Sequence, residues 1–243
     1  MRVPRIFTDQ PLQVGQLIVL EKDPSIHLIK VLRLSKGHQL ELFNGNNSSY
    51  AAEIITIDRN EVSAHILRQS TVDNESPLQL HLYQGISRGD KMDLTLQKAV
   101  ELGVKHFTPM ITERCGVKLD EKRWQKKREH WIKIIQSACE QSGRNAIPTL
   151  HPVMTFTEAL DKISPQSIFL EPSSENRFNN IQLPDLTSEI QLWVGPEGGF
   201  SDNEVIQVKL KGCTPVNLGP RILRTETAAL AAVSCINSVW GDF

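Results

Sequence analysis

Residues 217–240 read NLGPRILRTETAALAAVSCINSVW, and this stretch predicts the most buried helix of the fold. Its second half, Thr227–Trp240, contains no charged residue. A helix that is apolar on every side is buried on every side. Its 14 residues would form a helix about 21 Å long, whereas a helix that spans a bilayer needs roughly 20 residues, or about 30 Å. The stretch therefore predicts a core helix, and no membrane partner is expected.

The first half of the same stretch has the opposite character. Gly219-Pro220 interrupts the chain, Arg221 and Arg224 follow, and Thr225 is expected to cap the helix with Glu226 in its first turn. Arginines beside a helix N-terminus attract negative charge. A polar loop that leads into a buried helix predicts a functional site.

Composition limits the classes of protein to consider. The 243 residues are 40% hydrophobic and 23% charged, which is typical of one large globular domain or two ordinary ones. The start of the chain has no apolar signal region, and the four cysteines form no CxxC pair, so we expect a reduced, cytoplasmic protein. The seven histidines show no ligand spacing, so no metal is expected. The net charge of −1 does not indicate a nucleic-acid partner, and any RNA contact must come from a local patch.

The pattern of strands and helices predicts two domains. Short alternating strands and tight turns over residues 1–70 indicate a small β-barrel, and residues 71–77 indicate a linker. Strands alternate with helices over residues 78–243, which predicts an α/β domain with a mostly parallel sheet covered on both faces.

Three loops of the second domain follow predicted strands: FLEPSSEN (169–176), GPEGGFSDNE (195–204) and GPRILRTE (219–226). Ligands of such sheets bind beyond the carboxyl ends of the strands. Glycines in the second loop allow a ligand to approach the backbone. It matches neither GK[ST] nor GxGxxG, and Glu197 would repel an anion, so a neutral or cationic ligand is favoured.

Simpler interpretations remain open at this point. GPEGG is equally well explained as a tight turn between a strand and a helix. Arg224 and Glu226 are also compatible with a structural ion pair. Trp124 and Trp131 are better explained as core or interface anchors than as platforms on which bases stack.

Two motifs, WVGPEGGF (193–200) and LGPRILRTETA (218–228), resemble the paired signature of the ribosomal RNA small-subunit methyltransferase E family. These enzymes are uridine N3-methyltransferases of 16S rRNA in the SPOUT superfamily. The resemblance covers nearly the whole chain, and Asn44 and Asn46-Asn47 depart from it in one hairpin. The further matching segments are MRVPRIF (1–7), HLIKVLR (27–33), LFNGNNSSYAAEI (42–54), QGISRGDKMDLTLQKAVELGV (84–104), TERC (112–115) and QSGRNAIP (141–148).

The resemblance implies an S-adenosylmethionine-dependent methyltransferase that acts in ribosome biogenesis and methylates N3 of one uridine in the 16S rRNA of the small ribosomal subunit. It implies a PUA-like, RNA-binding barrel at residues 1–70. For residues 78–243 it implies a SPOUT-type domain whose last segment forms a trefoil knot. A homodimer whose active sites draw on both subunits is also implied.

With the family in view, site residues can be predicted. Arg221 and Arg224 are candidates to stabilise an anion or contact phosphate, Glu226 is a weak candidate for the base, and Arg144 is expected to steady the target nucleotide from the partner subunit. An alternative for Arg144 is a cation that favours a helix end. Arg2, Arg5 and Arg33 are predicted to contact RNA phosphates. The cofactor is predicted to contact Leu170, Gly195, Glu197, Gly199, Leu218, Gly219, Ile222 and Leu223.

Two competing functions stay open. Within the superfamily the protein could be a ribose 2′-O-methyltransferase or a tRNA guanine methyltransferase. From another class, it could be an assembly factor that binds RNA without catalysis.

Overall fold

The computed structural model describes residues 3–71, 73–117, 120–183 and 185–243. The chain forms two compact units: residues 1–75 with 136–147, and residues 76–135 with 148–243. The structure thus joins residues 136–147 to the N-terminal unit, whereas the sequence-based limits leave them in the C-terminal domain.

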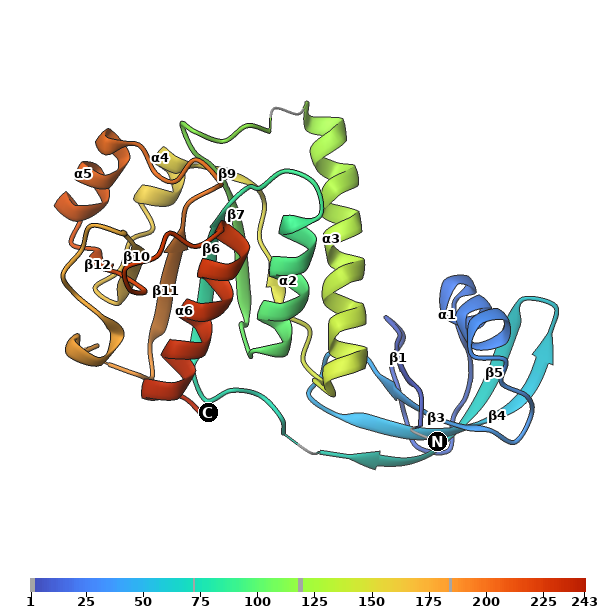
Figure 1. The fold of residues 1–243 in the computed structure, drawn as a ribbon. Coiled ribbons are helices and arrows are strands. Elements are labelled where there is room, and N and C mark those ends of the chain that lie inside the picture. Colours follow the sequence, from blue (N-terminus) through green and yellow to red (C-terminus); the bar gives the residue numbers. More distant parts are fainter. Residues whose placement is uncertain (1–2, 72, 118–119, 184) are drawn as a thin grey trace. The chain divides into compact units, whose positions relative to one another are not determined.

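The N-terminal unit is a mixed five-stranded sheet in the order β1-β3-β4-β5-β2 (Figure 1). Only β1 and β3 pair in parallel. Between β2 and β3, α1 (Lys22–Ile26) continues as a π-helix, η1 (His27–Val31). The strands are β1 (Arg5–Phe7), β2 (Leu17–Val19), β3 (Gln39–Phe43), β4 (Ser49–Asp58) and β5 (Glu61–Ser70).

Alternating burial along β4 produces the core of this unit. Ala52 and Ile54 are fully buried on one face and pack with Leu40 and Ile66 from the neighbouring strands. The strands were therefore predictable from their period of two.

The C-terminal unit is a parallel sheet in the order β12-β10-β11-β6-β7-β8, with β9 paired to β7. The alternation of strands and helices predicted this class of sheet. Its strands are β6 (Gln79–Gly85), β7 (His106–Ile111), β8 (Thr149–Leu150), β9 (Met154–Thr155), β10 (Ser167–Leu170), β11 (Glu189–Val194) and β12 (Thr214–Val216).

Helices cover both faces of this sheet. α2 (Lys91–Glu101) and α6 (Thr225–Trp240) lie side by side on one face (Figure 1). On the other face, α4 (Phe156–Leu160) and α5 (Asp202–Leu210) pack over a core in which Tyr83 and Trp193 stack with ring centroids 4.7 Å apart. The remaining helices are α3 (Glu121–Ser142) and the short η2 (Phe178–Asn180).

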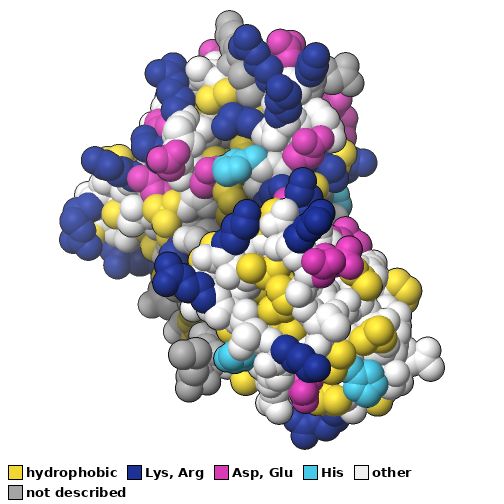
Figure 2. Space-filling view, turned by 90° about the vertical axis from the view of Figure 1, so that its right-hand side faces the viewer, with side chains coloured by type: hydrophobic (Ala, Val, Ile, Leu, Met, Phe, Trp, Pro, Cys, Tyr) yellow, Lys and Arg dark blue, Asp and Glu magenta, His cyan; other side chains and the backbone are white. Residues whose placement is uncertain are grey.

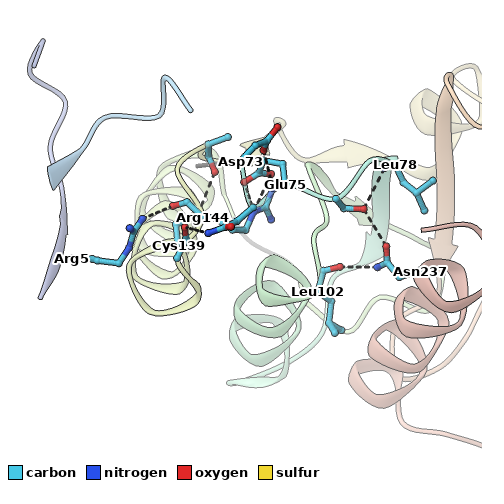
Figure 3. A network of polar contacts seen from close by, with 12 residues as sticks. Arg5, Asp73, Glu75, Leu78, Leu102, Cys139, Arg144 and Asn237 are labelled. Atoms are coloured by element: carbon cyan, nitrogen blue, oxygen red, sulfur yellow. Dashed lines mark hydrogen bonds and ion pairs between the residues drawn. The ribbon is translucent and has the colours of Figure 1, made fainter. Parts of the chain in front are cut away.

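Helix α6 is less buried than its composition predicts. Thr227, Ser238 and Val239 are exposed, so the helix is not covered on every side. Its N-cap residue is Arg224 rather than Thr225, and no side chain caps it. Near its end, Asn237 donates to the carbonyl of Leu102 at 2.8 Å and accepts from the Ser76 hydroxyl at 3.2 Å, which ties both ends of this unit together (Figure 3).

A buried polar cluster lies towards the amino ends of β6, β7 and β11. The ring of His81 stacks on that of His151 at 4.9 Å, and its nitrogens contact Glu189 at 3.0 Å and Thr108 at 2.8 Å. Burial lowers the pKa of His81 to about 4. Among the described residues, no group of three or more His, Cys, Asp or Glu side chains has a geometry that could hold a metal ion.

No helix in the described parts of the chain is both long enough and apolar enough to cross a membrane.

Candidate functional site

A cavity of about 780 Å³ lies where β10 and β11 end. The loops after these two strands form most of its wall, and the segment before α6 closes it. It is lined by six of the eight residues predicted to contact the cofactor, which come from three separate loops: Leu170, Gly195, Glu197, Gly199, Ile222 and Leu223. The structure thus brings the three loops together, as expected for parallel strands whose carboxyl ends share one edge.

The path of the Gly195–Gly199 loop depends on missing side chains. A Cβ at Gly195 would lie 3.0 Å from the Gly199 carbonyl carbon, and one at Gly85 would lie 2.4 Å from the Pro196 nitrogen. Gly199 has a φ of +66°, which side chains strongly disfavour. The loop is therefore more than a generic turn: its backbone is folded tightly beside the cavity and against the end of β6.

The side chains of Thr225 and Gln84 hold the Gly195–Gly199 loop in place through hydrogen bonds. The Thr225 hydroxyl donates to the Gly195 carbonyl at 2.6 Å, and the Gln84 amide donates to Thr225 Oγ1 at 3.0 Å. All three residues are buried. The first residue of α6 is thus bonded directly to the glycine loop, and Gln84 at the end of β6 supports this contact. The sequence did not predict it.

Glu197 lines the cavity, but its charge is already engaged. Its carboxylate accepts from the Arg88 backbone N–H at 2.9 Å and from Lys91 Nζ at 3.2 Å. Burial alone would raise the pKa of Glu197, but these donors hold it below its usual range. Glu197 therefore anchors the loop to the start of α2.

Arg114 was missed as a site residue by reasoning from spacing. It follows β7, lines the cavity, and donates from one guanidinium nitrogen to the Gly198 and Phe200 carbonyls at 3.3 and 3.0 Å. The signal for it in the sequence is the TERC segment, which carried weight only through the family resemblance. Lys91, also missed, lines the cavity as well.

The predicted catalytic residues near α6 separate in the structure. Arg224 is exposed and lines the cavity, whereas Arg221 is exposed and does not line it. Glu226 is 8% exposed, and among the described residues its Oε2 has no hydrogen-bond partner. No ion pair joins Arg224 and Glu226 in the described part of the chain, so the structural pairing considered above is not observed.

Leu218 and Gly219 do not line this cavity. They border a smaller one of about 280 Å³, together with Cys235 and Val239 of α6. Their predicted contact with the cofactor has no support from the shape of the larger cavity.

The arginines predicted to contact RNA in the N-terminal unit lie in different environments. Arg5 is engaged inside the unit: it pairs with Glu41, donates to the Asn145 side chain at 2.8 Å, and lies over the Phe43 ring. Arg33 is exposed and has a φ of 53°, an unusual conformation for a side chain of this size. Arg2 lies outside the described residues.

Arg144 also belongs to the N-terminal unit and not to the rim of the cavity. Its side chain is 4% exposed and forms an ion pair with Glu75, and its carbonyl accepts from Arg5 at 3.1 Å (Figure 3). A role in the active site of a second subunit would require Arg144 to break its buried ion pair with Glu75.

Comparison with known proteins identifies the two parts of the chain. Residues 74–237 match the family model of an RNA methyltransferase domain, and residues 25–67 match that of an RNA methyltransferase PUA domain. These matches agree with the predicted SPOUT-type and PUA-like parts.

Relatives cover the whole chain. A ribosomal RNA small subunit methyltransferase E of Buchnera aphidicola subsp. Schizaphis graminum is 38% identical, over 99% of this chain and 98% of the relative. That of Bacillus subtilis is 32% identical, over 95% and 93%. The crystal structure of the Neisseria gonorrhoeae enzyme of this name, bound to S-adenosylmethionine, has a TM-score of 0.92 and 41% identity over 100% of both chains. With its glycine loop, its cavity and its two matched domains, this chain belongs to the ribosomal RNA small subunit methyltransferase E family.

Proposed function

We propose that the protein transfers a methyl group from S-adenosylmethionine to N3 of one uridine in 16S rRNA, on the assembled small ribosomal subunit. The observation that carries this proposal is the cavity walled by the Gly195–Gly199 loop, with Arg224 on its rim. The names of the relatives support the rRNA substrate, and the cofactor of the Neisseria gonorrhoeae neighbour supports S-adenosylmethionine.

The residues present fit this cofactor. The volume of about 780 Å³ lies in the range of small-molecule sites. Leu170, Leu223 and Val205 offer apolar walls, and Gly195 and Gly199 line the cavity without a side chain that would fill it. When bound, S-adenosylmethionine supplies a methyl group on a cationic sulfur. Because Glu197 is already paired with Lys91, its charge contributes to loop position more than to recognition of that sulfur.

Arg224 is the residue best placed to assist the chemistry. The N3 proton of uridine must leave, and negative charge then develops on the ring oxygens. N3 bonds to the methyl carbon as the carbon–sulfur bond breaks, and the neutral thioether is the leaving group. A guanidinium at the rim of the cavity donates to those oxygens and makes the imide more acidic. Water accepts the proton in this proposal, because the Glu226 carboxylate does not line the cavity.

Arg221 is better suited to a phosphate contact. It is exposed, lies three positions before Arg224, and does not line the cavity. In the N-terminal unit, Arg33 is exposed and is the described residue that we propose to contact RNA there.

We also infer that the active protein is a homodimer. Small side chains that are only partly buried follow one side of α6, an otherwise apolar helix; they are Ala231, Ser234 and Cys235, with Thr227 and Ser238 exposed beside them. A second subunit packed on this side would complete the burial that the composition predicts.

A knot in the last segment is the second inference about architecture. The Asn217 backbone N–H donates to the Asn176 carbonyl at 2.9 Å, and its side chain donates to the Ser174 carbonyl at 2.6 Å. A few residues later Thr225 bonds to Gly195. The segment is therefore held by the loops after both β10 and β11, which supports threading. Since relatives act on ribosomal RNA, we propose a cytoplasmic location.

One experiment tests the reaction. The protein is incubated with labelled S-adenosylmethionine and small subunits from cells that lack the gene, and the methylated nucleoside is identified by mass analysis. N3-methyluridine is the expected product. A 2′-O-methylated nucleoside, or methylguanosine from tRNA, would establish a rival enzyme, and binding of RNA without methylation would leave the assembly factor. Parallel incubation with protein-free 16S rRNA checks whether assembly is needed.

A further inference from the structure

A second cavity of the C-terminal unit, of about 1000 Å³, is not used by the proposed reaction. We call it the α3 groove, because the first turns of α3 form one wall and residues 152–158 another. Its lining includes Ile111, Lys122, Trp124 and Lys126.

The α3 groove opens at the same edge of the sheet as the cofactor cavity. Ile111 ends β7 and Thr155 ends β9, while Leu170 and Val194 end the strands at the cofactor cavity. All these strands are parallel, so their carboxyl ends share one edge. Only β6 lies between β7 and β11, which separates the two strand ends by about 10 Å.

A short segment of chain also connects the two cavities. The chain leaves the groove at Ile111 and reaches the cofactor cavity at Arg114, three residues later. A ligand that extended beyond the cofactor cavity along this edge would therefore meet the α3 groove.

One aromatic side chain, Trp124, lines the groove and packs against a buried aromatic residue. Trp124 is half-buried, and its ring lies 6.4 Å from that of the fully buried Trp131. Trp131 is itself held by a hydrogen bond from its indole N–H to Asp93 at 3.1 Å. An indole held in this way at a groove is suited to stack on a nucleobase, a contact that tolerates any base.

The acidic residues of the groove are occupied by local partners. Asp120 accepts from the Arg123 backbone N–H at 2.8 Å. Glu158 accepts from the Thr155 backbone N–H and hydroxyl, both at 2.8 Å. Glu129 accepts from the Gln125 amide at 3.0 Å. Each of these three carboxylates therefore accepts hydrogen bonds from a residue three or four positions away in its own segment.

Two lysines of the groove form no ion pair among the described residues. Lys122 and Lys126 are exposed and four residues apart on α3, and neither has an ion-pair partner in the described part of the chain. Figure 2 shows Lys and Arg side chains gathered around the start of α3, near the top of the view. Exposed cations and an aromatic ring that line the same groove match the phosphates and bases of a nucleic-acid strand.

We propose that the α3 groove binds a single-stranded segment of the RNA substrate next to the target uridine. A base stacks on Trp124, and Lys122 and Lys126 contact the phosphates on either side of it. The proposal rests on the proposed function, because it takes the ligand to be the RNA that is methylated.

The test compares two groove variants with matched controls. Lys122→Gln with Lys126→Gln removes two charges. As the control, Lys209→Gln with Lys211→Gln removes two charges at the end of α5 and just after it, outside the groove. Trp124→Leu removes the aromatic face, while Trp124→Phe keeps one. Affinity for a single-stranded RNA of about ten nucleotides is measured against salt concentration, and S-adenosylmethionine affinity is measured by calorimetry to confirm a folded cofactor site.

The groove lysine variant should flatten the slope of log affinity against log salt by about 1.4, or about 0.7 for each phosphate contact. Trp124→Leu should weaken binding at least about fivefold with an unchanged slope, and Trp124→Phe should retain most of the affinity. S-adenosylmethionine affinity should stay the same throughout. RNA affinities and salt slopes equal to those of the controls would overturn the proposal.

Methylation by the unmodified protein separates this outcome from a failure of the proposed function. If the unmodified protein methylates rRNA and the groove variants match the controls, only the groove assignment is wrong. If the variants lose activity on assembled subunits but keep both RNA affinity and activity on protein-free rRNA, the groove holds a ribosomal protein, and the RNA proposal is overturned. If the unmodified protein methylates no RNA, the proposed function itself fails.

Discussion

Arg144 donates from Nε to Glu75 Oε1 at 3.0 Å, and the two side chains are 4% and 10% exposed. The pair joins the residues that follow α3 to the segment that precedes β6, and Arg5 adds a hydrogen bond to the Arg144 carbonyl (Figure 3). A buried charge pair of this kind makes Arg144 part of the packing of the N-terminal unit.

We predict that Arg144→Ala and Glu75→Ala each destabilise the protein by about 3–5 kcal/mol, because each leaves a buried charge without its partner. The double variant Arg144→Leu with Glu75→Leu should recover most of that loss. Urea unfolding measures all three. Additive losses in the double variant would show that the two side chains do not depend on each other.

The hypothesis that Arg144 acts in the partner's active site makes a separate prediction. Arg144→Ala and Arg224→Ala homodimers should both be nearly inactive, and a mixed dimer of the two should regain one working site. Activity of purified mixed dimers, set against both parents, provides the measurement. Mixed dimers no more active than their parents would leave Arg144 with its structural role alone.

Gly199→Val should weaken S-adenosylmethionine binding about tenfold or more, since a β-branched residue at a φ of +66° costs about 1–3 kcal/mol and displaces the loop. Gly212→Val is the matched control: its φ is +86°, it also has open space around it, and it does not line the cavity. Calorimetry should show lower affinity only for the first. Equal affinities in the two variants would place the cofactor elsewhere.

Arg224→Ala should lower kcat by about 10²–10³, the usual cost of a lost donor to a developing negative charge, with S-adenosylmethionine affinity retained. Arg221→Ala should instead raise KM for RNA and leave kcat nearly unchanged. Steady-state kinetics on the methylated substrate distinguish them. The reverse assignment of kcat and KM effects would exchange the proposed roles of the two arginines.

Acid should destabilise the protein through His81. Its pKa of about 4 in the folded state, against 6.5 for an unperturbed histidine, means that the unfolded chain binds the proton first. Stability is therefore lost as the pH falls from about 6.5 towards 4, by at most about 1.4 kcal/mol per pH unit. The lowered pKa of Glu189 acts in the same direction at the acid end of this range. Urea unfolding from pH 7 to 4.5 should give a flatter profile for His81→Asn, and an equal slope in both proteins would contradict this origin.

The regular elements were predictable because their patterns are local. The alternation along β4 and the apolar face of α2 fixed a strand and a helix from neighbouring residues alone. The loops after β10 and β11 were also found, since strand ends and glycines mark them in the sequence. A short helix through Leu32 is expected from the sequence, but the π form of His27–Val31 is not, because these residues have an ordinary helical composition.

What escaped prediction depends on contacts between distant residues. Arg5 reads as a free surface charge until Glu41 and Asn145 are placed beside it. Arg114 and Lys91 join the cavity only because the loops after β6 and β7 lie against the glycine loop. Residues 136–142 look like the end of one long helix and residues 143–147 like the loop after it. Nothing in their spacing reveals that they pack with the N-terminal unit.

The parallel sheet has a consequence for synthesis on the ribosome. Strand β6 pairs with β11, whose residues are made much later, and the bonds of Asn237 to Ser76 and Leu102 form later still. Domains usually fold as they emerge, from the N-terminus onward. Here the five strands of the first unit are complete by Ser70, and β6 can pair with β7 soon after it is made, but its other edge stays unpaired until β11 (Glu189–Val194) has emerged. The nascent chain therefore leaves one edge of β6 open until β11 emerges, which makes this edge the place where a chaperone would protect the growing protein.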